Sequence, residues 1–285
     1  MDNLRLCRNC SKKNRLNFMK KILKKIIPEI FFHFITKLRY GYFGKYEDWK
    51  KVKEKTTGYD NKIILEKVKN SLLKVKNGEA IYERDSVIFD KKEYSWPLLA
   101  SLLLIAGENE NQLNLIDFGG SLGSTYFQNK VFFKHLKSLH WNIVEQPNFV
   151  SCGKKYFEDE FLHFYNDIDE CLAKEKPSAI LLSSVIEYIE KPYELLKKII
   201  DSNFQYIILD RINFSEDNSE FITLQKVPPQ IYTASYPCWF FSEQKFLNFF
   251  SGKYELLADF VALGGKIKQN NIKGYYKGFI FKIKK

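Results

Sequence analysis

The feature that most constrains the fold is a regular alternation of apolar runs and helix-compatible segments that begins at Leu113. We expect strands at 114–117, 142–145, 162–165, 179–183 and 206–210, with helices around 124–139, 148–158, 167–175 and 192–202. Strands that alternate with helices form a parallel sheet covered by helices on both faces. The sequence therefore predicts an α/β fold with a Rossmann-like, doubly wound sheet.

Two more strands follow, in the stretches YELLADFVAL and GYYKGFIFKIKK. Gly264-Gly265 and an Asn-rich turn separate them, which predicts an antiparallel hairpin at the C-terminal end of the sheet. Upstream, N-terminal helices are expected at 61–75 and 93–107, with a loop between them. The expected organisation is a basic arm with an amphipathic helix at 1–60, a helical lead-in at 61–112 and the Rossmann-like domain at 113–285, which carries an aromatic insertion near 222–245.

The positive charge of the chain, +11 in total, is concentrated at its N-terminal end. Residues 1–60 contain 16 Lys or Arg against 6 Asp or Glu, whereas the remainder contains 29 against 28. A nucleic-acid enzyme is expected to carry its positive charge around the active cleft, so this distribution argues against a nucleic-acid partner. Segment 19–42 alternates Lys with Ile, Leu and Phe, which favours peripheral contact with a membrane surface. The alternative is a helix that packs on the main domain, and Met19 is an alternative start of the protein.

The five cysteines are scattered, which is typical of free thiols in a reducing compartment. Cys7 and Cys10 form a CxxC without a second ligand pair, so no metal site is expected. No apolar stretch approaches the length of a transmembrane helix, and the N-terminus does not resemble a signal peptide. We expect a cytoplasmic protein, at most peripheral at the inner membrane face.

The stretch LNLIDFGGSLGSTYF, residues 113–127, is expected to form a ligand-binding turn after the first strand. A P-loop would need a Lys after its glycines, and a dinucleotide fingerprint would need glycines where Ser121 and Ser124 stand. Polar residues also end the later strands: Glu145, Asn166-Asp167, Ser183-Ser184 and Asp210-Arg211. Ligands of doubly wound sheets bind at this edge, so these polar residues predict a polar ligand there.

The pattern Asp117-x-Gly119-Gly120-Ser121-x-Gly123 resembles the first motif of the class I S-adenosylmethionine-dependent methyltransferases, an acid-x-Gly-x-Gly-x-Gly pattern. Gly119 and Gly123 match its first and third glycines, and Ser121 replaces the second. The stretch WNIVEQPN resembles the family's second strand, whose terminal acid, here Glu145, accepts hydrogen bonds from both ribose hydroxyls. FYNDIDEC resembles the segment that contacts the adenine amino group, here through Asp167 or Asn166. A terminal antiparallel hairpin is also a family trait.

The resemblance implies an enzyme that uses S-adenosyl-L-methionine as its cofactor. The residues expected to contact it are Asp117, Gly119, Gly120, Ser121, Gly123, Glu145, Gln146, Asp167 and Ser183. Arg84 is expected to hold the carboxylate of the cofactor or to pair with a neighbouring acid. Three segments, YERDSVIFDKKEYSWPLL, VEQPNFV and KVPPQIYTASYPCWFFSE, more narrowly resemble methyltransferases encoded near bacterial surface-polysaccharide genes. This resemblance implies O-methylation of a small or sugar-like acceptor.

A hydroxyl acceptor benefits from a general base, and the candidates are Glu187 and Asp210. The Pro-stiffened aromatic insertion is expected to cover the acceptor through Tyr232, Tyr236 and Trp239, or to be a structured loop that packs on the domain. Two other functions remain open. An NAD-dependent or nucleotide-sugar-modifying enzyme would use a Tyr-x-x-x-Lys pair, which Tyr193 and Lys197 provide in the sequence. A non-catalytic membrane-associated protein would depend on the basic arm.

Overall fold

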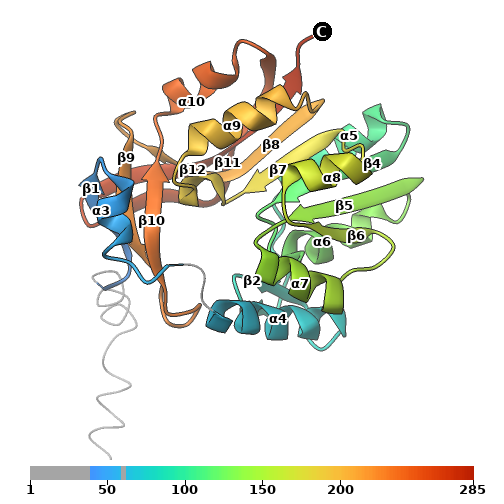
Figure 1. Cartoon of the computed structure of the whole chain (residues 1–285), viewed down its shortest axis with the longest axis horizontal. Helices are drawn as coiled ribbons and strands as arrows, with labels where there is room; N and C mark the ends of the chain where they lie inside the picture. The colour runs from blue at the N-terminus through green and yellow to red at the C-terminus, as the bar shows by residue number, and fades with distance from the viewer. Residues whose placement is uncertain (1–38, 59–61) are drawn as a thin grey trace, which may run out of the picture. The chain divides into compact units, whose positions relative to one another are not determined.

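The computed structural model describes residues 39–58 and 62–285 of the chain (Figure 1). Residues Tyr42–Lys285 form a compact unit built on a seven-stranded sheet with the order β11-β12-β8-β7-β4-β5-β6. The strands of this sheet are β4 (Gln112–Phe118), β5 (Ser138–Val144), β6 (Leu162–Tyr165), β7 (Ala179–Ser183), β8 (Tyr206–Ser215), β11 (Tyr254–Gln269) and β12 (Ile272–Ile283).

The sheet confirms the expected doubly wound topology. From β4 the chain moves outward through β5 to β6, then crosses back to β7 and β8 on the other side of β4, and these five strands are parallel. β12 lies antiparallel to both β8 and β11, which gives the expected C-terminal hairpin. The switch point therefore lies between β4 and β7, where ligands of doubly wound sheets bind.

Helices cover both faces of this sheet because alternate strand residues point to opposite sides. On β7, Leu181 packs with the helices of one face, and Ile180 and Leu182 pack with those of the other. The first face carries α4 (Lys62–Lys76), α5 (Trp96–Glu108), α6 (Ser124–Asn129) and α7 (Pro147–Tyr156). The second carries α8 (Ile168–Lys174), α9 (Pro192–Asp201) and α10 (Glu243–Phe250).

Two small sheets stand beside the main one, and local sequence patterns did not predict either. The expected loop before α5 contains a hairpin of β2 (Tyr82–Arg84) and β3 (Val87–Phe89). The aromatic insertion contains β9 (Phe221–Lys226) and β10 (Ser235–Phe240), which form a three-stranded sheet with β1 (Gly41–Tyr46). The strands of the hairpin are only three residues long, and β1 depends on pairing with the distant β9, so their own sequences give a weak signal.

Several boundaries differ from the expected ones. The helix predicted at 124–139 ends at Asn129, whose side-chain amide donates to the carbonyl of Thr125, and the 3-10 turn η1 (Lys130–Phe133) follows. Gly264-Gly265 lies inside β11, at a shift in pairing register, and the hairpin turn is formed by Asn270 and Asn271, both with positive φ.

The described part of the chain contains no helix long and apolar enough to cross a membrane. The basic segment 19–42 lies outside the described residues as far as residue 38. Its expected membrane contact therefore stays a prediction.

Candidate active site

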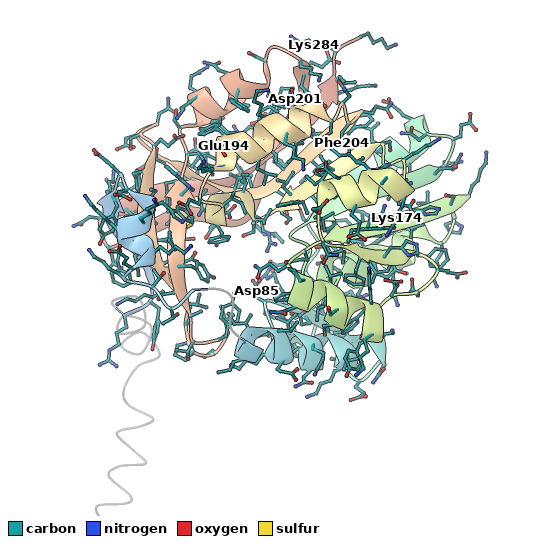
Figure 2. All side chains as sticks on the ribbon, viewed as in Figure 1. Asp85, Lys174, Glu194, Asp201, Phe204 and Lys284 are labelled. Carbon is teal, nitrogen blue, oxygen red and sulfur yellow. The ribbon has the colours of Figure 1, made fainter. Side chains whose placement is uncertain are left out.

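A cavity of about 910 Å³ opens at the carboxyl ends of β4, β5 and β7, beside Asp210 and Arg211 of β8. The β2–β3 hairpin contributes to its wall through Glu83, Arg84 and Asp85, the last of which is labelled in Figure 2. Strands β9 and β10 and the loop that joins them form a further side of the wall. The cavity thus lies at the switch point of the sheet and is partly enclosed by the two small sheets.

The glycine-rich turn after β4 forms one side of this cavity, and its glycines are required by close contacts. A Cβ atom at Gly119, where φ is +70°, would lie 2.4 Å from Cγ2 of Val185. A Cβ atom at Gly120 would lie 2.5 Å from the carboxyl carbon of Asp117. Gly123, with φ of +100°, is the N-cap of α6 and does not line the cavity. The two glycines therefore let the turn pack against Val185 and Asp117, and the stretch from Gly119 to Ser121 lines the cavity.

Asp117, the acid before this turn, is buried but lines the cavity. Its Oδ2 accepts a hydrogen bond of 2.9 Å from the Trp141 indole N–H. Burial raises the pKa of Asp117 to about 7, and the hydrogen bond from Trp141 opposes this rise. The carboxyl group is therefore held in one position beneath Gly120.

Glu145 ends the neighbouring strand and lines the same part of the cavity, with Gln146 next to it. Its Oε2 accepts a hydrogen bond of 2.7 Å from the backbone N–H of Gln146. Burial raises the pKa of Glu145, and the backbone N–H groups of Gln146 and Ser121 lower it. Ser121 has φ of +55°, and its buried Oγ has no hydrogen-bond partner in the structure. The serine that replaces the second glycine thus directs its backbone N–H to Glu145.

Asn166 and Asp167, which the sequence left as alternatives, occupy different positions. Asn166 lines the cavity, and both its backbone N–H and its side-chain amide donate to Glu170 at 2.9 Å. Asp167 lies outside the cavity lining and is the N-cap of α8, where its side chain accepts from the Glu170 N–H at 2.8 Å. The cap satisfies a helix donor and needs no ligand.

A hydrogen-bonded group forms where β7 and β8 end their parallel pairing. The Ser183 hydroxyl donates to Oδ2 of Asp210 at 2.8 Å, and Nη2 of Arg211 donates to the Ser183 hydroxyl at 3.2 Å. Asp210 is 2% exposed and lines the cavity, and its Oδ1 has no hydrogen-bond partner. Burial raises the pKa of Asp210, and the charge of Arg211 opposes this rise.

Arg211 received no role from the sequence, although it directly follows a strand-end acid. Its Nε lies 3.5 Å from Oδ2 of Asp210. Ser184 follows β7 and Arg211 lies in β8, each directly after the point where the two strands stop pairing, and both have positive φ, at 54° and 57°. Strained backbone of this kind is concentrated at functional sites.

Glu187, the other candidate base, lies in the 3-10 turn η2 (Ile186–Tyr188) and is fully buried. It is not among the residues that line the cavity. Oε1 accepts a hydrogen bond of 3.1 Å from the Ser184 hydroxyl, and Oε2 has no partner. Burial raises the pKa of Glu187 to about 8, so the group is largely protonated at neutral pH.

Arg84 lines the cavity, but its Nη1 lies 3.2 Å from Oε2 of the exposed Glu93. The residue before it, Glu83, was missed by the sequence and is almost completely buried. It accepts hydrogen bonds of 2.6 Å from the Ser124 hydroxyl and from the backbone N–H of Ser86. Burial raises the pKa of Glu83 to about 7. Glu83 thereby ties the hairpin tip to the first turn of α6.

The aromatic residues expected to cover the acceptor divide into two groups. Tyr232 and Tyr236 line the cavity, and their hydroxyls are 3.4 Å apart. Trp239 lies outside the lining, donates to the Ile189 carbonyl at 3.1 Å and stacks on Trp49. This position matches the alternative of a segment that packs on the domain.

Other expected chemistry is not assembled in this cavity. The Tyr193 hydroxyl donates to Glu220 at 2.5 Å, the Lys197 ammonium pairs with Asp201 on the surface, and neither residue lines the cavity. Within residues 39–58 and 62–285, no group of three or more His, Cys, Asp or Glu could hold a metal ion.

No protein-family model and no curated protein matches this chain. Among solved structures, the N-terminal domain of EvdMO1 with SAH and D-fucose has 9% identity and a TM-score of 0.45, covering 71% of this chain and 90% of that chain. The glycopeptide N-methyltransferase MtfA with SAH has 8% identity and a TM-score of 0.46, covering 65% and 89%. An S-adenosylmethionine-dependent methyltransferase from Clostridium acetobutylicum has 11% identity and a TM-score of 0.40, covering 66% and 91%. At this level of similarity, the activity of the chain must be argued from its own residues.

Proposed function

We propose that this protein is an S-adenosylmethionine-dependent methyltransferase. The observation that carries the proposal is the pairing of the Gly119–Ser121 turn with the carboxylate of Glu145 at the switch point, on one side of a single cavity. Gly119 and Gly120 carry no Cβ atom, so a flat, polar ligand can approach their backbone closely. A strand-end carboxylate beside it is suited to accept hydrogen bonds from a diol such as ribose.

The residues of this half of the cavity fit an adenosine-containing cofactor. Glu145 would accept hydrogen bonds from the ribose hydroxyls, and Asn166 would contact the adenine. The unpartnered Oγ of Ser121 offers one more polar contact at the turn. When bound, S-adenosylmethionine supplies a methyl group that is already activated for transfer.

The acceptor would be a small or sugar-like molecule methylated at a hydroxyl oxygen, within surface-polysaccharide metabolism. Asp210 is the better placed base because it lines the cavity with a free Oδ1, whereas Glu187 is sealed behind the wall. Ser183 and Arg211 hold the other oxygen of Asp210 and so orient the carboxylate. Asp210 would take the hydroxyl proton as the acceptor oxygen bonds to the methyl carbon and the methyl–sulfur bond breaks, which leaves S-adenosylhomocysteine as the second product. Asp210 would later release the proton to water.

Calorimetric titration of the purified chain with S-adenosylmethionine and, in parallel, with NAD⁺ tests the proposal. We expect saturable binding of S-adenosylmethionine and of its product S-adenosylhomocysteine, with no binding of NAD⁺ at the same concentrations. Folded protein that binds neither sulfur compound at millimolar concentration would refute the proposal. Binding of NAD⁺ alone would favour the dehydrogenase alternative.

A further inference from the structure

The unpartnered polar atoms of the cavity lie in two places. Among its described lining residues, the buried side-chain atoms without a hydrogen-bond partner are Ser121 Oγ, Asp210 Oδ1, Arg211 Nε and Gln225 Oε1. Ser121 belongs to the glycine-rich turn, whereas Asp210 and Arg211 lie in β8 where its pairing with β7 ends, and Gln225 lies on β9. Buried polar groups are nearly always paired in native proteins, so atoms left open toward a cavity indicate a ligand.

Gln225 is brought to the cavity by the pairing of β9 with β10. It lies directly opposite Tyr236 in the register, so the two side chains share one face of the small sheet. The neighbouring Leu224 points to the other face and packs with Val52 of α3 (Trp49–Lys53). The small sheet therefore has an apolar face under α3 and an opposite face that presents an amide and a phenol to the cavity.

A chain of contacts connects this face with Asp210. The ring of Tyr236 lies 5.0 Å from that of Tyr188, in η2. The next residue in the turn, Glu187, is close enough to Arg211 and Asp210 for their charges to act on its pKa. Asp210, Arg211, Gln225 and Tyr236, here called the acceptor subsite, thus line connected parts of one cavity wall.

The open atoms of the acceptor subsite are mainly hydrogen-bond acceptors. A carboxylate oxygen and an amide oxygen both require a donor from the ligand. Phosphate and ionised carboxylate offer only acceptors, so either group would leave Asp210 Oδ1 and Gln225 Oε1 without a donor. The open oxygens therefore disfavour an anionic ligand at this place.

The charge balance also disfavours a cationic ligand. The guanidinium of Arg211 is 3.5 Å from Asp210 and already neutralises its carboxylate. Glu187 behind the wall is largely protonated at neutral pH because burial raises its pKa to about 8. Three other charged lining residues near this side, Lys53, Asp85 and Glu190, are exposed to solvent, which screens their charges. An ammonium ion bound here would be repelled by Arg211 and would find no buried carboxylate whose charge is not already balanced.

We propose that the acceptor subsite binds an uncharged polyol, such as a pyranoside, through one hydroxyl that donates to Asp210 Oδ1 and a second that donates to Gln225 Oε1. The inference rests on the proposed methyltransferase function and assigns Gln225 as a determinant of acceptor specificity. The hydroxyl at Asp210 is the one that reacts. The hydroxyl at Gln225 fixes the orientation of the ring, and Tyr236 offers an aromatic face for its C–H groups.

The test measures binding of matched glycosides to the full chain saturated with S-adenosylhomocysteine. The probes are a panel of neutral methyl pyranosides, the corresponding uronic acids and the corresponding amino sugars, followed by ligand-observed NMR. We expect at least one neutral glycoside to bind and its charged counterparts to bind at least tenfold more weakly. Tighter binding of the charged counterparts, or no binding of any neutral glycoside, would overturn the inference.

The variant Gln225→Leu removes the open acceptor at nearly constant volume. We expect it to weaken binding of the neutral glycoside about tenfold, as loss of a buried partner does, and to leave S-adenosylhomocysteine affinity unchanged. Gln244→Leu, on the exposed face of α10, is the matched control and should change neither affinity. Equal glycoside binding by Gln225→Leu and the parent chain would remove Gln225 from the inference. If the parent chain does not bind S-adenosylhomocysteine, the proposed function itself is refuted.

Discussion

Replacing Glu145 with Ala tests the cofactor half of the cavity most directly. One carboxylate oxygen of Glu145 already accepts the 2.7 Å hydrogen bond from the Gln146 backbone, and a carboxylate can accept about four hydrogen bonds in all. Two ribose hydroxyls can therefore be accommodated without breaking the existing contact. Hydrogen bonds to a charged group contribute about 1.5–3 kcal/mol each, and partial exposure reduces this value.

We expect Glu145→Ala to lose about 2 kcal/mol of binding free energy, which corresponds to a roughly 30-fold larger dissociation constant for S-adenosylmethionine. Glu145→Gln keeps one carbonyl oxygen, so its loss should be smaller, about 1 kcal/mol. Isothermal titration calorimetry measures both variants against the parent chain.

Glu160→Ala, at an exposed acid in the turn before β6, serves as the matched control and should bind as the parent chain does. Thermal denaturation of each variant verifies that it is folded. A folded Glu145→Ala variant whose affinity stays within twofold of the parent would show that Glu145 does not hold the ribose. The position of Glu145 beside the glycine-rich turn would then no longer support a cofactor site there.

Three further predictions concern the turn, the hairpin and the N-terminal arm. Gly120→Ala would place a Cβ 2.5 Å from the carboxyl carbon of Asp117, so it should lower the unfolding free energy by about 1–3 kcal/mol and weaken cofactor binding. The control Gly252→Ala, whose Cβ would meet nothing within 4 Å, should change neither. Equal melting temperatures of the two variants would contradict this expectation. Burial raises the pKa of Glu83 to about 7 in the folded chain, against about 4.3 in the unfolded chain. The free energy of unfolding should therefore be highest below about pH 4.3 and should fall as the pH rises towards 7. Glu83→Gln should reduce this fall by up to about 1.4 kcal/mol per pH unit, measured by urea denaturation at pH 5, 6 and 7. If the unfolding free energy changes with pH equally in the variant and the parent chain, the burial of Glu83 does not cause the fall. Anionic liposomes should pellet the full chain and not a chain without residues 1–38, which keeps β1; equal pelleting would exclude the membrane role.

Much of the main sheet could be read from the sequence because its signals are local. Each parallel strand is an apolar run followed by a polar residue, and the runs around Ile116, Ile143 and Leu181 were all located correctly. The hairpin after α10 was equally accessible through its turn residues. The extension of β8 to Ser215 was not accessible, because residues 212–215 pair with β12 beyond the point where β7 ends.

The two small sheets show the limit of this approach. The turn at Asp85 and Ser86 has positive φ at two non-glycine residues, so the usual glycine signal for a tight hairpin is missing. Gln225 looked like one polar residue in an aromatic insertion. Its role becomes visible only when β9 and β10 pair and place it opposite Tyr236 on the cavity side.

The sequence by itself determined the sheet, the position of the glycine-rich turn and the set of polar strand ends, since these depend on residue patterns within a few positions. Tertiary structure decided which polar group faces the cavity: Asn166 rather than Asp167, and Asp210 rather than Glu187. Each choice depends on the direction of one side chain and on its burial by residues far away in the chain. Glu187 is sealed by the packing around η2, and Asp210 keeps one oxygen open because Ser183 and Arg211 hold the other. Such contacts exist only in the folded molecule.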